Sequence, residues 1–242
     1  MPRADQFVAH RGYARHYPEN TLTAITAAIH AGARHVEVDI QFSRDGVPLL
    51  YHDVDMQRVS AVAGKVFDFD AAELVEMPAF EPGRFGRQFR DVPISLASEF
   101  AHLVAVKAGV HFYVELKSES IDHFGVTHCL ACLQETLAPV LRQCTLIGDD
   151  HAAMLLAKQQ YGFPATGLVF RDWARRDELI RRYHADIAYI NIQRIPAGDA
   201  ITAACPIAVY EIDQPAQATT ALQRGAALVE TFAIGELIEA LC

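Results

Sequence analysis

Short apolar runs alternate with longer amphipathic stretches along the whole chain, and polar residues stand where several of the apolar runs end. Such runs predict strands, and the stretches between them predict helices. The strands are expected at residues 7–9, 35–40, 111–117, 144–147, 165–170, 187–191, 207–210 and 227–230. Eight strand–helix units in 242 residues are typical of an α/β protein that forms a (β/α)8 TIM barrel rather than an open doubly wound sheet.

The stretches between the strands predict helices. We expect them over residues 20–31, 96–107, 121–138, 150–161, 172–183 and 216–224, as a short helix after Pro196, and from Gly235 onward. The stretch from Val54 to Val92 interrupts the alternation and predicts a small insertion after the second strand. Its phenylalanines form either a lid over the site or a satellite cluster beneath the loop; they are Phe67, Phe80, Phe85 and Phe89. Because no linker-like change in composition appears, we expect a single domain over residues 1–242.

Charged residues alternate with apolar ones in the second and third strands. Glu37 and Asp39 share one face of the second strand, because side chains alternate along a strand. They either face solvent at an edge strand or point inward, where a divalent cation would offset their charge. Glu115 and Lys117 repeat the pattern in the third strand, which favours the inward arrangement. Three carboxylates with no cysteine nearby favour Mg²⁺ or Ca²⁺ over zinc.

Two of the eleven histidines end apolar runs on the side where a barrel carries its active site. They are His10, which Arg11 follows, and His52. Imidazole titrates near neutral pH, so one histidine can act as a base while the other acts as an acid. Either assignment agrees with the sequence. The other histidines fall in loops, in helices or at strand starts, where we expect surface or capping roles.

These residues belong to five motifs within a short stretch. The motifs are His10-Arg11-Gly12, Pro18-Glu19-Asn20-Thr21, Glu37-Val38-Asp39, Asp45-Gly46 and His52-Asp53. In this order and spacing they closely resemble the glycerophosphodiester phosphodiesterase family, and the size is closest to its compact cytoplasmic bacterial members. The resemblance implies a phosphoric diester hydrolase that releases an alcohol and glycerol 3-phosphate with the help of one divalent cation.

The resemblance also implies roles for individual residues. It implies His10 and His52 as the catalytic pair, and Glu37, Asp39 and Glu115 as metal ligands. It implies that Arg11 and Lys117 contact phosphate, although an ordinary ion pair between Lys117 and a carboxylate remains an alternative. Glu19 either orients Arg11 or a glycerol hydroxyl, or caps the first helix. The attacking group is either water or the substrate's own glycerol hydroxyl.

The chain departs from the family pattern late in the sequence. The departing segments are Gly148-Asp149-Asp150, Tyr210-Glu211-Ile212-Asp213 and Glu230-Thr231-Phe232, where members usually carry Ser-Phe, a Trp-Thr-Val-Asn-like run and Thr-Asp. The catalytic and metal sets stay intact, but acids are added around the expected site. We expect them to favour a cationic or polyol alcohol group over an anionic one.

Two other functions agree with the same residues. One is phospholipase D-type cleavage of lysophospholipids, which needs apolar surface beside the site. The other is a non-enzymatic barrel that binds phosphate, which the complete catalytic and metal sets argue against. A sugar-phosphate isomerase is disfavoured, because the late loops lack the Gly-rich phosphate site of such barrels.

Composition argues against several classes of partner, whereas the resemblance implies a small-molecule glycerophosphodiester substrate. A net charge of −9 argues against bulk binding to nucleic acid or anionic lipid. No apolar run approaches the length of a membrane span, and the first strand begins too early to leave room for a signal peptide. Five scattered cysteines, an odd number, are expected to be reduced. We therefore expect a cytoplasmic protein; the sequence predicts no oligomeric state.

Overall fold

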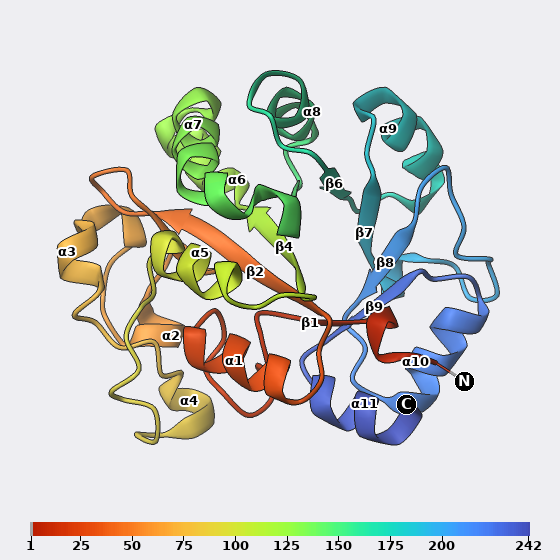
Figure 1. Cartoon of the computed structure of the whole chain (residues 1–242), viewed down its shortest axis with the longest axis horizontal. Helices are drawn as coiled ribbons and strands as arrows, with labels where there is room; N and C mark the ends of the chain where they lie inside the picture. Colours follow the sequence, from red (N-terminus) through yellow and green to blue (C-terminus); the bar gives the residue numbers. More distant parts are fainter. Residues whose placement is uncertain (1) are drawn as a thin grey trace.

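A closed barrel of parallel strands forms the centre of the computed structural model, which describes residues 2–242 (Figure 1). Within this range its eight parallel strands are β1 (Phe7–Ala9), β2 (His35–Phe42), β4 (His111–Leu116), β5 (Cys144–Gly148), β6 (Thr166–Val169), β7 (Ile187–Asn191), β8 (Ile207–Tyr210) and β9 (Leu228–Thr231). Strand β1 pairs with both β2 and β9, and this pairing closes the sheet. The predicted TIM barrel is confirmed.

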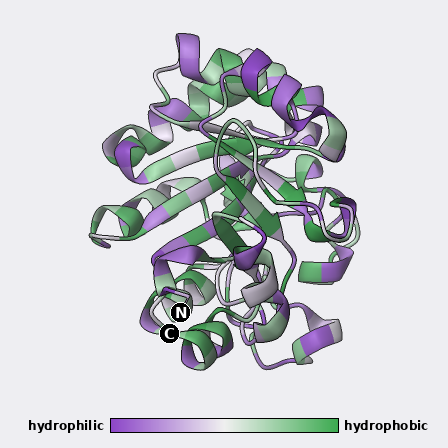
Figure 2. Ribbon diagram, turned by 90° about the vertical axis from the view of Figure 1, so that its right-hand side faces the viewer, coloured by the Kyte–Doolittle hydropathy of each residue, from purple (hydrophilic) through white to green (hydrophobic). Residues whose placement is uncertain are grey.

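The alternation of side chains along the strands divides the apolar residues between two cores. Val38 of β2 and Val114 of β4 belong to the large core between strands and helices. Tyr113 and Tyr189 belong to a small core inside the barrel, where their rings lie 5.4 Å apart. Hydrophobic residues accordingly gather on the strands and on the helix sides toward them (Figure 2). A filled interior leaves the strand ends as the place for a site.

Helices surround the barrel in the expected order. They are α1 (Leu22–His30), α5 (Ala97–Ala105), α6 (Ser118–Phe124), α7 (Val126–Leu137), α8 (His151–Gln160), α9 (Arg176–Tyr183), α10 (Pro215–Gln223) and α11 (Ile234–Leu241). A single helix is expected over residues 121–138, but the structure has two, α6 and α7, which are separated at Gly125. Gly125 has a φ of +83°, which lies outside the range of an α-helix. Within residues 2–242, every helix falls short of the length and apolar character that crossing a membrane requires.

The prediction of a short helix after Pro196 is wrong. A 3₁₀ turn, η5 (Ile192–Arg194), lies before this proline instead. The following backbone turns at Gly198, whose φ is +89°. The guanidinium of Arg224 donates to the carbonyl oxygens of Pro196 and Asp199, at 3.0 and 2.9 Å. Backbone carbonyls that are bound by a side chain in this way stabilise an irregular loop in place of a helix.

The insertion over residues 54–92 carries its own small core. Its elements are α2 (Gln57–Ser60), η2 (Val66–Asp68), α3 (Ala71–Leu74) and α4 (Pro82–Phe85), and it follows β3 (Pro48–Leu50), which pairs antiparallel with β2. Leu49, Met56 and Leu74 are buried together at its centre. Phe67 stacks on His123 of α6, at 4.6 Å.

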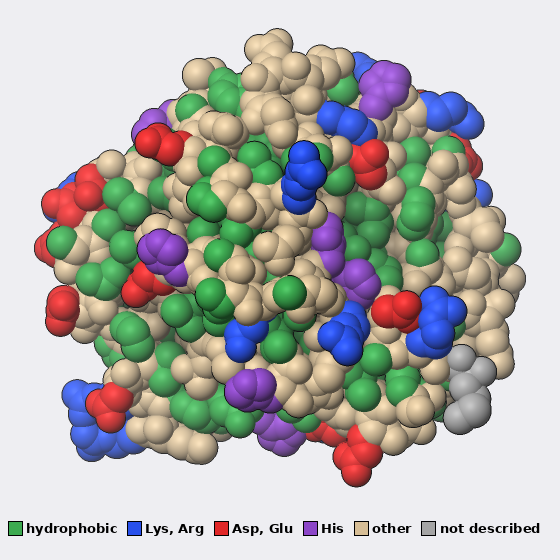
Figure 3. All heavy atoms as spheres, viewed as in Figure 1, with side chains coloured by type: hydrophobic (Ala, Val, Ile, Leu, Met, Phe, Trp, Pro, Cys, Tyr) green, Lys and Arg blue, Asp and Glu red, His purple; other side chains and the backbone are tan. Residues whose placement is uncertain are grey.

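Phe85 and Phe89 of the insertion pack elsewhere. Phe85 packs edge-on against Phe89, at 5.1 Å between ring centroids, and Phe89 packs against Tyr17. Phe67 and Phe85 therefore belong to separate contacts, and the satellite cluster agrees with the structure better than a lid. The face of the molecule seen in Figure 3 carries acidic and basic side chains interspersed with apolar ones.

Candidate active site

A cavity of about 370 Å³ opens at the carboxyl ends of the barrel strands. It is lined by His10, Arg11, His52, Glu115, Lys117, Ser118, Glu119, Ile147, Asp149, Val169, Arg171, Tyr189, Tyr210, Glu211 and Glu230. Among residues 2–242, the lining takes none of its side chains from the insertion. Glu37 and Asp39 lie nearby and are each 1% exposed. The structure thus brings the predicted catalytic and metal-binding residues together.

The turn after β1 places Arg11 over the carboxylates. Gly12 has a φ of +81°, and a Cβ atom on it would lie 2.6 Å from the backbone carbon of Ala24. Only glycine allows this close approach to α1. The turn directs the Arg11 N–H to Glu37 Oε2, at 3.1 Å, and places Arg11 Nε 3.0 Å from Asp39 Oδ2. The motif His10-Arg11-Gly12 is therefore explained by backbone geometry.

Asp39 is the best compensated of the buried carboxylates. Asn20 donates to Asp39 Oδ2 at 2.8 Å, and Lys117 Nζ lies 3.4 Å from Oδ1. Burial alone would raise the pKa of Asp39, but the charges of Arg11 and Lys117 outweigh it and hold the pKa well below its usual range. Asp39 is therefore ionised at neutral pH.

Glu37 and Glu115 are poorly compensated. Glu37 Oε1 has no hydrogen-bond partner within residues 2–242. Burial raises the pKa of Glu37 well above its usual value, and the neighbouring carboxylates raise it further. Burial also raises the pKa of Glu115, although Lys117 Nζ donates to it at 2.8 Å. Without a bound cation, the ionised forms of both carboxylates are therefore disfavoured.

This donor set fits a divalent cation. Oxygen atoms of Glu37, Asp39 and Glu115 all lie within 4.8 Å of one another. An unpartnered oxygen in a buried carboxylate cluster is what a hard cation with oxygen ligands would satisfy. The chemistry of the three residues therefore agrees with a Mg²⁺ or Ca²⁺ site.

His10 lies buried against the carboxylates. Its Nε2 lies 3.8 Å from Glu37 Oε2. Its ring stacks on Phe232, with centroids 4.4 Å apart and planes 10° from parallel. Burial lowers the pKa of His10 well below 6.5, and the adjacent charge of Arg11 lowers it further. The imidazole is consequently neutral at pH 7.

His52 is oriented by a carboxylate. Its Nδ1 lies 2.6 Å from Asp53 Oδ1, and Arg58 Nε donates to the other oxygen of Asp53 at 2.6 Å. Burial would raise the pKa of Asp53, but the hydrogen bonds from His52 and Arg58 hold it well below its usual range. Asp53 is therefore an ionised partner that fixes the ring, with Nε2 free of this contact.

Glu19 lies between two arginines rather than at a helix cap. Arg11 Nη1 donates to it at 3.1 Å, and Arg58 Nη2 donates to it at 2.7 Å. Thr21 caps α1 instead, because its side chain accepts from the N–H of Ala24. The backbone N–H of Glu19 donates to Glu81 of the insertion, at 2.9 Å. The insertion thus supports the side chain that holds Arg11.

The late acidic residues have different surroundings. Glu211 and Asp149 line the cavity. Asp213 accepts hydrogen bonds from Thr231 Oγ1 at 2.8 Å and from the N–H of Phe232 at 3.0 Å, so its carboxylate stabilises the turn after β9. Asp150 caps α8, because its side chain accepts a hydrogen bond from an N–H in the first turn of that helix. Glu211, Asp149 and Glu230 are the late acids that reach the site.

The predicted site set leaves out several residues of this arrangement, and four of them show what a sequence can and cannot signal. Asp53 was foreseeable as the neighbour of His52 in the His-Asp motif. Glu230 was noted only as a departure from the family pattern, and an acid at the end of a strand that enters a barrel cavity is the signal that was available. Glu81 and Tyr189 carry no such signal, since one lies in an irregular insertion and the other in an apolar run.

Comparison with known proteins identifies the family. The family model for the glycerophosphoryl diester phosphodiesterase family matches residues 10–231. The chain belongs to this family. A glycerophosphodiester phosphodiesterase of Bacillus altitudinis is 33% identical over 118 residues, which cover 49% of this chain and 47% of that protein. The matched part thus spans about half the length of this relative.

Further relatives support the assignment. A glycerophosphodiester phosphodiesterase of Caldanaerobacter subterraneus subsp. tengcongensis is 31% identical over 173 residues, which cover 61% of this chain and 70% of that protein. A solved Oleispira antarctica phosphodiesterase structure aligns with a TM-score of 0.82 and 21% identity, covering 98% of this chain and 96% of that chain. This structural likeness shows the same fold.

Proposed function

We propose that this member of the family is a metal-dependent glycerophosphodiester phosphodiesterase that releases an alcohol and glycerol 3-phosphate. The observation that carries the proposal is the meeting of His10 and His52 with Arg11, Lys117 and a carboxylate triad at one cavity. The related Oleispira antarctica structure is described as a complex with the product sn-glycerol-3-phosphate.

Glu37, Asp39 and Glu115 would hold the divalent cation. A bound Mg²⁺ or Ca²⁺ supplies positive charge to the phosphoryl oxygens in the transition state. Arg11 and Lys117 provide fixed positive charge beside this position, since both contact Asp39. These two residues bind and orient the diester, whose charge increases as the nucleophile adds.

His10 and His52 divide the proton transfers. His10 is neutral and buried, so its imidazole can take a proton from the attacking water or glycerol hydroxyl. His52 donates its Nδ1–H to Asp53, which fixes the ring and leaves Nε2 available for the leaving group. His52 is thus the acid that protonates the departing alkoxide. Glu19 positions Arg11 in this scheme and does not touch the reacting atoms.

The alcohol group of the substrate is expected to be cationic or a polyol. Glu211 lines the same cavity as Tyr210, and the two offer a carboxylate and an aromatic face. Both groups interact favourably with a cationic ammonium. Arg171 also lines the cavity, so a polyol that hydrogen-bonds to both charges suits the same surface. Neither group provides the long apolar surface that an acyl chain of a lysolipid needs.

The deciding experiment measures glycerol 3-phosphate release from a panel of glycerophosphodiesters with Mg²⁺, with Ca²⁺ and with a chelator. The proposal expects release that depends on the metal and is fastest with a cationic or polyol alcohol. A cyclic phosphate that accumulates before glycerol 3-phosphate would identify the glycerol hydroxyl as the nucleophile. A folded protein that releases nothing with either metal contradicts the proposal, and lysolipids would be tested next. A cytoplasmic location and a single domain stay predictions.

A further inference from the structure

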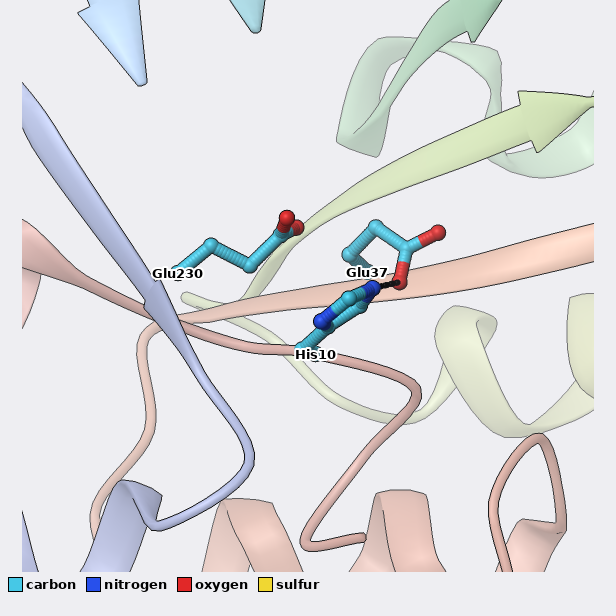
Figure 4. Close-up of side chains that lie close together, drawn as sticks. All are labelled: His10, Glu37 and Glu230. Atoms are coloured by element: carbon cyan, nitrogen blue, oxygen red, sulfur yellow. Dashed lines mark ion pairs between the residues drawn. The ribbon is translucent and has the colours of Figure 1, made fainter. Parts of the chain in front are cut away.

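A second group of metal-binding side chains lies beside the expected metal site. Ligand atoms of His10, Glu37 and Glu230 all lie within 4.8 Å of one another, and these three residues are buried. They come from the ends of β1 and β9 and from β2, and their side chains converge in Figure 4. Glu230 is absent from the triad of Glu37, Asp39 and Glu115.

Glu230 is a buried acid that forms no ion pair with a basic side chain among residues 2–242. It is 3% exposed, and its Oε1 has no hydrogen-bond partner in residues 2–242. Arg11 contacts Glu19 and Asp39, and Lys117 contacts Asp39 and Glu115. Neither basic residue forms an ion pair with Glu230 within that range. A buried carboxylate in this position is costly unless a ligand compensates it.

Glu37 belongs to both groups. Its Oε2 lies 3.8 Å from His10 Nε2, and its Oε1 is the oxygen without a partner. In Figure 4 the side chains of Glu37 and Glu230 lie beside the His10 ring, and the dashed line joins one Glu37 oxygen to that ring. The ring itself stacks on Phe232 and presents Nε2 toward Glu37, and its Nδ1 has no hydrogen-bond partner among residues 2–242.

We propose that His10, Glu37 and Glu230 form a second cation site, which takes a borderline transition metal such as Zn²⁺. An imidazole nitrogen with two carboxylates is a donor set that suits Zn²⁺ and is poorly suited to Mg²⁺. The triad of Glu37, Asp39 and Glu115 offers oxygen alone and suits the harder cation. The two sites therefore differ in metal preference although they share Glu37.

Occupancy of this second site has a direct consequence for hydrolysis. A metal bound to His10 Nε2 occupies the lone pair with which that nitrogen would accept a proton. Zn²⁺ therefore inhibits the reaction while Mg²⁺ or Ca²⁺ supports it. The binding itself does not depend on the proposed function, since it is measured on the folded protein without any substrate.

The test compares the two metals across two isosteric variants. Glu230→Gln is expected to weaken Zn²⁺ binding by at least about tenfold and to leave Mg²⁺ binding unchanged, when both are measured by titration calorimetry. Glu115→Gln is expected to do the reverse. Glu211→Gln is the matched control, because this carboxylate lines the same cavity outside both triads; its Zn²⁺ affinity should equal that of the unaltered protein.

Zinc X-ray absorption on the unaltered protein provides a second measurement that needs no variant. An imidazole nitrogen in the zinc shell supports the proposal. A shell of oxygen alone overturns it, as does unchanged Zn²⁺ affinity in folded Glu230→Gln. Zn²⁺ affinity that falls only in Glu115→Gln also overturns it, because zinc would then occupy the all-oxygen site. If the protein hydrolyses no diester, the binding results still decide this proposal separately.

Discussion

Nδ1 of His52 lies 2.6 Å from Oδ1 of Asp53, and Arg58 holds the other oxygen of the same carboxylate. This contact fixes the histidine ring and its tautomer. Asp53→Asn keeps the shape but removes the charge, so we expect kcat to fall by roughly 10²-fold or more, with little change in KM. Steady-state kinetics measure the effect. Asp55→Asn, two residues along the chain, is the control, and equal activity of both variants would remove the role given to Asp53.

The two histidines are expected to act in one reaction. Replacing either His10 or His52 with alanine should lower kcat by about 10²–10⁴-fold, because general acid or base assistance is lost. The double variant should lose much less than the product of the two effects, since residues that act as a unit are not additive. Circular dichroism should show an unchanged fold. A fully active double variant would exclude this mechanism.

Gly12 is the backbone position on which the placement of Arg11 depends. Gly12→Ala brings a Cβ atom to 2.6 Å from the backbone of Ala24, so the turn or α1 must shift. Gly162→Ala is the matched control, because its φ is also positive, at +69°, and a Cβ atom there meets open space. We expect Gly12→Ala to destabilise the protein by about 1–3 kcal/mol more than the control. Urea unfolding measures both values, and equal losses would contradict the steric argument.

The sequence predicts the parts of the site that follow strand geometry. Glu37, Asp39 and Glu115 were foreseeable because a strand has a period of two and parallel strands end at one edge. The division of the helix at Gly125 and the loop after Pro196 were not foreseen, since both depend on individual backbone angles and side-chain contacts. The contact between Glu19 and Glu81 was also missed. It joins residues 62 positions apart, and no local pattern encodes such a pair.

His111 provides a test of stability against pH outside the cavity. Burial lowers its pKa from 6.5 to about 4, and the nearby His35 lowers it further. The unfolded chain therefore binds a proton at pH 5 that the folded protein does not, so stability falls as the pH is lowered from about 6.5 to about 4. His111→Gln should reduce this loss by about 1–2 kcal/mol, less than the full shift because solvent reaches part of the ring.

Urea unfolding at pH 7 and pH 5 measures this difference for both proteins. His102→Gln is a suitable control, since this histidine is exposed on α5. If the unaltered protein and His111→Gln lose the same stability between the two pH values, the lowered pKa of His111 has no part in the acid sensitivity of the fold.

Replacing Glu37 is expected to change both Mg²⁺ binding and the free energy of unfolding. Without a cation, burial beside Asp39 and Glu115 disfavours the ionised form of Glu37, so Glu37→Gln should raise the free energy of unfolding in chelator by about 1 kcal/mol or more. In the unaltered protein, Mg²⁺ at a hundred times its Kd should add about 2.7 kcal/mol, because it binds the folded state alone. Glu37→Gln should lose this gain, whereas Glu211→Gln should keep it. A Mg²⁺-dependent rise in Tm that survives in Glu37→Gln would contradict a cation site that includes Glu37.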